Sequence, residues 1–249
     1  MSKKSIPVNL LKTQKDQFNK ISKTYESEEN RRVSRAIFNI SVEKYFQRLR
    51  GSRVLDVGNG GLKPSTILGE EIAASLTSFV AVDKNEEMLH RTKKDDYVKI
   101  VADGANLPFE DKSFDYVLLN GVLHHLGLDS NEDQYLKFER LFKELARVCV
   151  KEIIVLEIFL PEQLEKLERI AVKVLGSMPT FVLAESTLDA FLLKMGLRKQ
   201  EVLSKKFSDF VGPFYWYLVI LEYPWFKLPA FLSPFKYVYF TIPIKPKRK

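Results

Sequence analysis

Polar side chains follow four successive apolar runs in the middle of the chain. Asp56 lies in the run at 54–57 and is followed by a glycine-rich turn, while Asp83, Asp103 and Asn120 end the next three runs, at 79–82, 98–102 and 114–119. Carboxylates accept hydrogen bonds from hydroxyl groups and pair with cations. Glycines let a ligand come close to the backbone. These residue types suit a ligand that carries hydroxyls and a positive charge.

The spacing of apolar residues predicts the elements that must hold these groups. Short apolar runs alternate with helical patterns at 64–76, 135–145, 161–174 and 187–195, the last capped by Ser186 or Thr187. Counting 152–159, 198–203 and 215–222, the runs give seven strands. Regular alternation of strand and helix predicts an α/β fold: a doubly wound, Rossmann-like, seven-stranded and mostly parallel sheet with helices on both faces.

The carboxyl ends of such strands share one edge of the sheet, and the ligand crevice lies there, where the strand order reverses. A nicotinamide dinucleotide is one candidate ligand, because Asp83 follows Gly58 by 25 residues. The glycine pattern fails, however, because Lys63 occupies the third glycine position. Asp56 would also repel a pyrophosphate. A cationic nucleoside without phosphates fits these acids better.

Three stretches resemble the class I S-adenosylmethionine-dependent methyltransferases, in particular the type 11 group that includes ubiquinone- and menaquinone-biosynthesis-like enzymes. They read VLDVGNGG, VAVDKNEEML and VADGANLPFEDKSFDYVLLNGVLHHL, and the resemblance covers about residues 50–160. The segment FNKISKTYES at 18–27 is also similar to the part of that family that folds over the cofactor. The resemblance implies S-adenosylmethionine as cofactor and S-adenosylhomocysteine as product.

The resemblance also implies a role for each matching residue. Asp56 and the turn would hold the methionine end, Asp83 the two ribose hydroxyls, and Asp103 the adenine amino group. The remaining cofactor-binding candidates are Gly58, Asn59, Gly60, Lys84, Met88, Gly104, Ala105 and Asn120. The alternative is that the acids are turn or cap residues and that the methionine packs in the core. The Leu62-Lys63-Pro64 insertion departs from the family's loop.

Methyl transfer from a sulfonium is an in-line displacement that needs alignment and a water-poor pocket. A general base is required only for a hydroxyl, an activated carbon or a protonated amine. His124 and His125 are the catalytic candidates, because imidazole titrates near neutrality. Neighbours on a helix diverge by about 100°, so one of them at most should face the pocket. The alternative is a pair that packs or caps a helix, and His90 is expected on a helix surface.

Composition limits the class of protein. Of the 249 residues, 45% are hydrophobic, which is typical of a globular chain. One cysteine, Cys149, excludes an internal disulfide and a cysteine metal cluster, so we expect neither a disulfide nor a metal. No amino-terminal signal sequence and no apolar run of about 18 residues is seen. These features predict a cytoplasmic protein, with a place at the periphery of a membrane as the alternative.

The net charge of +7 is spread unevenly, with +8 on residues 1–53, +6 on 227–249 and −7 between them. Basic ends could attract an anionic membrane surface or RNA, although solvated lysines are the simpler reading. We expect an amino-terminal helical cover (1–50), a methyltransferase domain (51–223) and a basic, aromatic carboxyl-terminal extension of the same domain (224–249). Aromatic residues from Phe214 to Tyr217 and the region 178–186 could form the acceptor pocket, or pack within the domain.

The predicted function is methyl transfer from S-adenosylmethionine to a small or lipid-like acceptor. Two alternatives remain open: an RNA or protein methyltransferase that uses the basic ends, and a cofactor-binding interaction module without catalysis. The chain has no N-P-P-Y-like tetrapeptide, which an amino-methylating enzyme of the first kind would carry.

Overall fold

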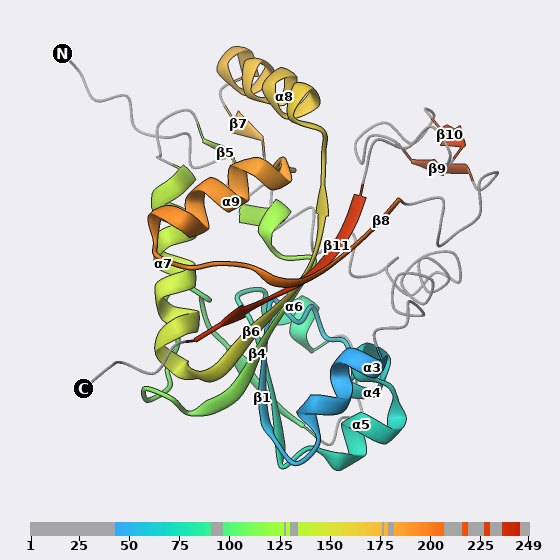
Figure 1. The fold of residues 1–249 in the computed structure, drawn as a ribbon, viewed down its shortest axis with the longest axis vertical. Helices are drawn as coiled ribbons and strands as arrows, with labels where there is room; N and C mark the ends of the chain where they lie inside the picture. The colour runs from blue at the N-terminus through green and yellow to red at the C-terminus, as the bar shows by residue number, and fades with distance from the viewer. Residues whose placement is uncertain are drawn as a thin grey trace.

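A seven-stranded sheet forms the centre of the computed structural model, which describes residues 43–90, 97–126, 128–129, 134–175, 177–178, 182–206, 216–218, 227–229 and 236–244 (Figure 1). The strand order is β3-β2-β1-β4-β6-β11-β8. The strands are β1 (Arg53–Val57), β2 (Ser78–Asp83), β3 (Val98–Val101), β4 (Phe114–Asn120), β6 (Cys149–Phe159), β8 (Gln200–Lys206) and β11 (Lys236–Pro243). Only β11 runs antiparallel to its neighbours among the described strands of this sheet, so the predicted mostly parallel sheet is confirmed.

Helices cover both faces of the sheet (Figure 1). One face carries α3 (Glu43–Phe46), the 3-10 helix η1 (Gln47–Leu49), α4 (Pro64–Leu68), α5 (Glu70–Ser75) and α6 (Glu86–Leu89). The other carries α7 (Gln134–Val148) and α9 (Glu185–Lys194), while α8 (Glu162–Leu175) lies past the end of β6. Because side chains alternate along a strand, Val54 packs with the first group and Leu55 with the second. The doubly wound arrangement follows from this alternation.

Two predicted helices differ from the structure. The helix expected at 64–76 is divided into α4 and α5 at Gly69, whose φ of 84° lies outside the helical region. Neither Ser186 nor Thr187 caps α9, which begins at Glu185 after Ala184 and has no side-chain cap. The Thr187 hydroxyl instead donates to Oε2 of Glu165 at 2.7 Å. A tertiary partner therefore replaced the local cap.

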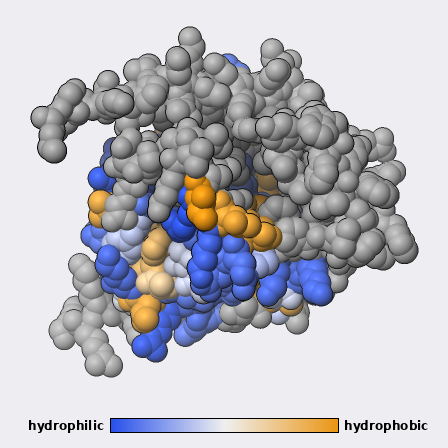
Figure 2. Space-filling model, turned by 90° about the horizontal axis from the view of Figure 1, so that it is seen from above, coloured by the Kyte–Doolittle hydropathy of each residue, from blue (hydrophilic) through white to orange (hydrophobic). Residues whose placement is uncertain are grey.

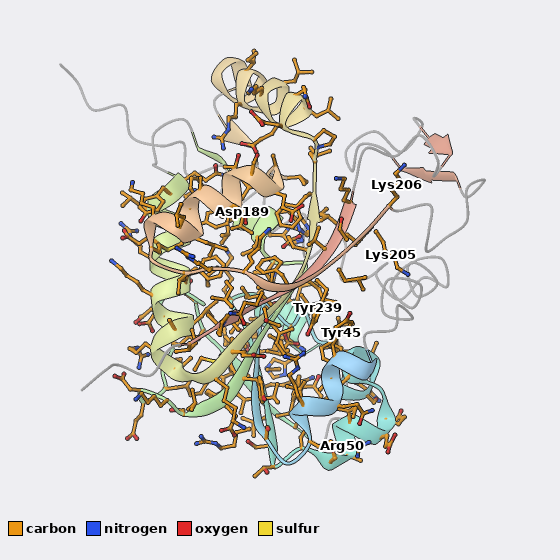
Figure 3. The ribbon with its side chains drawn as sticks, viewed as in Figure 1. Tyr45, Arg50, Asp189, Lys205, Lys206 and Tyr239 are labelled. Carbon is orange, nitrogen blue, oxygen red and sulfur yellow. The ribbon has the colours of Figure 1, made fainter. Side chains whose placement is uncertain are left out.

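The carboxyl-terminal part of the sheet was also predicted incorrectly. Of the strand expected at 215–222, the structure describes β9 (Trp216–Leu218), which pairs with β10 (Lys227–Pro229) rather than with the main sheet. The place in the sheet belongs to β11, which lies inside the expected extension. Tyr239 of β11 stacks near Tyr45 of α3, with ring centroids 4.8 Å apart (Figure 3). The end of the chain thus packs against its described beginning.

Short elements complete the described fold: the 3-10 helix η2 (Leu123–Leu126), and the paired two-residue strands β5 (Leu128–Asp129) and β7 (Ser177–Met178). In the described part of the chain, no helix combines the length and the apolar character that crossing a bilayer requires. The same residues contain no group of three or more metal-ligating side chains placed to hold an ion.

Candidate functional site

The site lies where the chain changes direction across the sheet. Strands β1, β2 and β3 follow one another toward one edge, and β4 then returns to the other side of β1. All four are parallel, so their carboxyl ends meet along one edge. Contacts between the following loops draw these ends together. This is the topological switch point at which open α/β sheets bind ligands.

Asp56 is a buried carboxylate next to the end of β1, with 1% of its surface exposed. Its Oδ2 accepts a hydrogen bond from Nδ2 of Asn59 at 2.7 Å. Oδ1 of Asp56 and Oδ1 of Asn59 have no hydrogen-bond partner among the described residues. Burial raises the pKa of Asp56 to about 7. A cationic group placed against these two oxygens would satisfy both and restore the charged carboxylate.

Asp83 closes the turn that follows β1 from the neighbouring strand. Its Oδ2 accepts from the Gly60 N–H at 2.9 Å, and its Oδ1 accepts from the Asn85 N–H at 2.8 Å. Burial raises the pKa of Asp83, and these backbone hydrogen bonds oppose the increase. The two oxygens of a carboxylate offer about four lone pairs, so Asp83 can accept a further hydrogen bond beside its backbone partners. Two vicinal hydroxyls are donors of this kind.

Gly58 lies where the turn after β1 approaches the loop after β4. A Cβ atom at Gly58 would lie 2.6 Å from Cγ2 of Val122, and its φ is +73°. The N–H groups of Gly58 and Asn59 both donate to the Val82 carbonyl, at 2.7 and 3.1 Å. Contact distance and φ therefore both require glycine at this position.

Asp103 begins the loop after β3 and is exposed. Its Oδ1 accepts from the Ala105 N–H at 2.9 Å, an arrangement in which the side chain shapes its own turn. Gly104 packs over the end of β1, since a Cβ there would lie 2.8 Å from Cγ1 of Val57. The loop after β3, which the sequence predicts to take part in the site, therefore contacts the end of β1. Asp103 itself combines the turn role with an exposed second oxygen.

Two residues of α7 fix this loop, and sequence reasoning missed them. Oε2 of Glu144 accepts from the Leu107 N–H at 3.1 Å, and Arg147 donates to the carbonyls of Leu107 and Phe109 at 3.1 and 2.7 Å. Glu144 and Arg147 are themselves paired at 2.8 Å. A helical pattern of apolar residues gives no sign of such contacts, because the polar face of α7 looks solvated in the sequence.

Of the remaining predicted site residues, some lie at the glycine turn and others on the surface. Met88 is buried in α6, with its Cε 3.7 Å from the Cβ position of Gly60. Lys84 is exposed after β2, as is Lys63 at the start of α4. Asn120 ends β4 and is half-buried. The structure thus brings Met88 to the glycine turn, and it places the ammonium groups of both lysines on the surface side of the site.

His124 and His125 lie in the 3-10 turn η2, directly after β4. Nδ1 of His124 lies 2.6 Å from Oε1 of Glu157, and the two imidazole centroids are 3.9 Å apart. The divergence expected of neighbours on an α-helix is therefore not seen. The two residues belong to a single 3-10 turn of four residues, in which the ring of His124 is held by Glu157. His90 is exposed at the end of α6, as predicted.

Glu157 is the second functional candidate that sequence reasoning missed. It is 3% exposed in β6, and it accepts from the N–H groups of Leu123 at 2.6 Å and Ile158 at 2.9 Å as well as contacting His124. A signal was present, because Glu157 is the only charged residue in the apolar run from 153 to 160. A carboxylate in such a run requires partners.

The residues predicted to form the acceptor pocket are described in part, at 178, 182–186 and 216–217. Phe214 and Tyr215 lie outside the described residues, while Trp216 and Tyr217 belong to β9. Viewed from above, apolar and hydrophilic side chains adjoin on the described surface (Figure 2). Among the side chains of α8 and α9 that the structure describes, Leu167, Ile170 and Leu193 are apolar and exposed.

Comparison with known proteins agrees with this geometry. Residues 55–155 match the family described as methyltransferase domain. The chain is 39% identical over 98 residues to the demethylmenaquinone methyltransferase of Corynebacterium glutamicum strain R, which covers 39% of this chain and 37% of that protein. The corresponding protein of Mycobacterium sp. strain KMS is 40% identical over 84 residues, or 32% of this chain and 35% of that one. The chain thus spans little more than a third of these relatives.

Solved structures share the fold. A chain in the complex of the Haloferax volcanii Trm112 methyltransferase activator with a methyltransferase has a TM-score of 0.60 at 17% identity, covering 95% of this chain and 98% of that one. Magnesium protoporphyrin IX methyltransferase from Synechocystis PCC 6803, solved with bound S-adenosylmethionine, gives 0.51 at 13% identity, covering 98% and 100%. Residues 55–155 thus match a methyltransferase domain, and the likeness to these solved structures shows that the chain shares their fold.

Proposed function

We propose that this chain binds S-adenosylmethionine at the edge formed by β1, β2, β3 and β4 and transfers its methyl group to a small or lipid-like acceptor. The observation that carries the proposal is the buried Asp56 carboxylate, whose Oδ1 has no partner among the described residues. A buried carboxylate without a cation is costly. The ammonium of the methionine moiety is a cation of the right kind to balance it.

The other described residues fit the rest of the cofactor. Asp83 lies at the end of β2 with both oxygens oriented by backbone N–H groups, which suits a charge-assisted contact with the ribose hydroxyls. Met88 packs beside the glycine turn, where it would contact the adenine. The second oxygen of Asp103 would accept from the adenine amino group. When bound, the cofactor supplies an electrophilic methyl group, and the protein aligns it and excludes water.

For the acceptor, we favour a quinol of the menaquinone type. The support is the similarity to demethylmenaquinone methyltransferases, which extends over 98 residues at 39% identity. The exposed apolar side chains Leu167 and Ile170 belong to α8, which lies past the end of β6, and would suit a lipid-like tail. RNA and protein acceptors remain the alternative, and much of the basic charge behind that reading lies outside the described residues.

Calorimetry with S-adenosylhomocysteine tests the cofactor site. The wild-type chain should bind it, Asp83→Ala should bind it more weakly, and Asp115→Asn should leave the affinity unchanged. Asp115 is the matched control, because it pairs with Arg53 at the opposite end of the same strands. No binding by the folded wild-type chain would refute the proposal and would equally exclude a cofactor-binding module.

Transfer of labelled methyl groups from S-adenosylmethionine tests the acceptor. Demethylmenaquinone, supplied both oxidised and chemically reduced, is compared with total RNA and with a protein extract. We expect label in the reduced quinone. Label in RNA or protein alone, at a rate that falls steeply with salt for RNA, would favour the alternative. Cofactor binding without transfer to any of them would favour the non-catalytic reading.

A further inference from the structure

We propose that Glu157 holds His124 as the proton acceptor of methyl transfer, so that the acceptor is a group that loses a proton from oxygen or carbon. This inference rests on the proposed function and adds to it a positioning residue and a class of acceptor. Its basis is the hydrogen-bond arrangement around Glu157, which connects β6 to the turn that follows β4. His124 is the group that would touch the substrate, and Glu157 acts through it.

The first step concerns the direction of the hydrogen bond between the two side chains. Backbone N–H groups can only donate, and both carboxylate oxygens of Glu157 accept from one: Oε2 from Leu123 at 2.6 Å and Oε1 from Ile158 at 2.9 Å. An ionised carboxylate is an acceptor only, so Nδ1 of His124 must donate across the 2.6 Å contact. In a neutral imidazole the lone pair then lies on Nε2. This is the tautomer that a general base requires.

The second step concerns where the imidazole of His124 lies in the fold. η2 begins three residues after Asn120, the last residue of β4. Cε1 of His124, which is bonded to both ring nitrogens, lies 3.6 Å from the Cβ position of Gly121. The imidazole therefore lies against the end of β4, at the switch point of the sheet. Its side chain is 14% exposed, so it is largely desolvated but open on one side.

His125 is excluded from this role by its surroundings. Burial lowers its pKa well below the usual value, and charge on His124 and Lys84 lowers it further. The two rings are 3.9 Å apart, so a proton on one imidazole opposes a proton on the other. Glu157 contacts the ring of His124, so His124 rather than His125 is the base that we propose. One imidazole of the pair accepts the proton, and the other stays neutral and packs beside it.

The reaction balances with these residues alone and the family's methyl donor. The acceptor oxygen or carbon forms a bond to the methyl carbon, and the carbon–sulfur bond breaks with its electron pair on sulfur. The proton of the acceptor goes to Nε2 of His124, and the carboxylate of Glu157 balances the imidazolium charge. Water then takes the proton from the imidazolium. A neutral amine needs no base during the transfer, so the pair favours protic oxygen and carbon acceptors.

Nuclear magnetic resonance of the imidazole nitrogens in the free protein tests the positioning step without any turnover. In the wild type at pH 8, His124 should carry its proton on Nδ1. In Glu157→Gln, the population with the proton on Nε2 should increase at least severalfold. Glu165→Gln is the matched control, since Glu165 is an equally buried carboxylate that accepts from the Ala184 N–H in another part of the fold. A wild-type His124 with its proton on Nε2 would overturn the proposal.

Kinetics with reduced demethylmenaquinone tests the catalytic consequence. Glu157→Gln and His124→Gln should each lower kcat by about 10²–10⁴-fold, the usual contribution of a general base, while S-adenosylhomocysteine affinity changes by less than about twofold. The double variant should be no slower than His124→Gln, because Glu157 acts through His124. Multiplicative losses would overturn the proposal, as would an unchanged kcat. If the wild-type chain does not bind the cofactor, the proposed function is refuted. The resonance measurement would still decide the role of Glu157.

Discussion

The backbone N–H of Gly60 donates to Oδ2 of Asp83 at 2.9 Å, so the turn after β1 and the end of β2 form one unit. The acid that we assign to the ribose thus also sets the shape of the turn assigned to the methionine end. Removing Asp83 should therefore affect both ends of the ligand. Losing a ligand contact and loosening the turn are expected to act together.

Asp83→Ala should weaken binding of S-adenosylhomocysteine by at least about 1–3 kcal/mol, because the ribose hydroxyls lose their acceptors. Calorimetry measures this loss, and circular dichroism checks that the fold is retained. Asp83→Asn should bind with intermediate affinity, since one oxygen remains to accept. An unchanged affinity in a folded Asp83→Ala protein would count against the site.

Asp56 should make the stability of the free protein decrease with rising pH. Its pKa rises from 3.8 to about 7 on folding, so the native state binds more protons than the unfolded state between these values. Its contribution to stability is full below about pH 4 and is lost as the pH rises through about 7. Asp56→Asn should therefore be more stable than the wild type at pH 8, by up to about 4 kcal/mol, and similar at pH 4. Urea unfolding at both pH values measures the difference.

Asp115 provides a control of opposite sign for this experiment. Although burial acts to raise it, the pKa of Asp115 is lowered overall by hydrogen bonds from the side chain and backbone of Arg53. Its stabilising contribution is present at neutral pH and is lost as the pH falls. Asp115→Asn should therefore destabilise the protein at pH 8 and have less effect in acid. Equal pH profiles for the two variants would contradict both assignments.

Binding of S-adenosylhomocysteine should strengthen as the pH rises from 6 to 8. A ligand ammonium needs the charged form of Asp56, so binding below pH 7 must release the proton of that carboxyl group. The affinity should fall by about tenfold between pH 8 and pH 6. Calorimetry at pH 6 in buffers of different ionisation enthalpy should detect the released proton. In Asp56→Asn, the dependence on pH should be absent and the affinity low throughout.

Gly58→Ala should cost more stability than Gly196→Ala. Both glycines have a positive φ, +73° and +74°, but a Cβ at Gly58 meets Val122 at 2.6 Å and one at Gly196 meets nothing within 4 Å. Gly196→Ala should therefore show the backbone strain alone, about 1–2 kcal/mol. The contact at Gly58 adds an overpacking cost of about 1–3 kcal/mol, measured by urea unfolding. Only the Gly58 variant should also lose cofactor affinity.

Phe240→Ala tests whether β11 is an integral strand. Phe240 is fully buried between β6 and β8, so the substitution should cost about 3–5 kcal/mol and expose β8 to hydrogen exchange. Lys236→Ala, at the exposed start of the same strand, should change stability by less than about 0.5 kcal/mol. If both variants were equally stable, the strand could not have the place in the sheet that we describe.

The sequence by itself determined the class of fold and indicated the edge of the sheet at which we propose the site. Apolar runs at strand spacing, such as 54–57 and 114–119, identify strands through local burial, and polar residues at their ends identify the edge where loops meet. Asp56, Asp83 and the glycine turn were found in this way. Their contacts are short in sequence or follow from the order of parallel strands.

Tertiary structure alone decided which distant residues complete the fold and the site. Lys236–Pro243 entered the sheet in preference to the expected strand at 215–222, because its place depends on pairing with strands far away in the chain. Glu157 contacts His124, which lies 33 residues away in the chain. Arg147 donates to carbonyls of the loop after β3, about 40 residues away. No local pattern encodes such partners. They exist because folding brings buried polar groups together, and each must then be satisfied within the core.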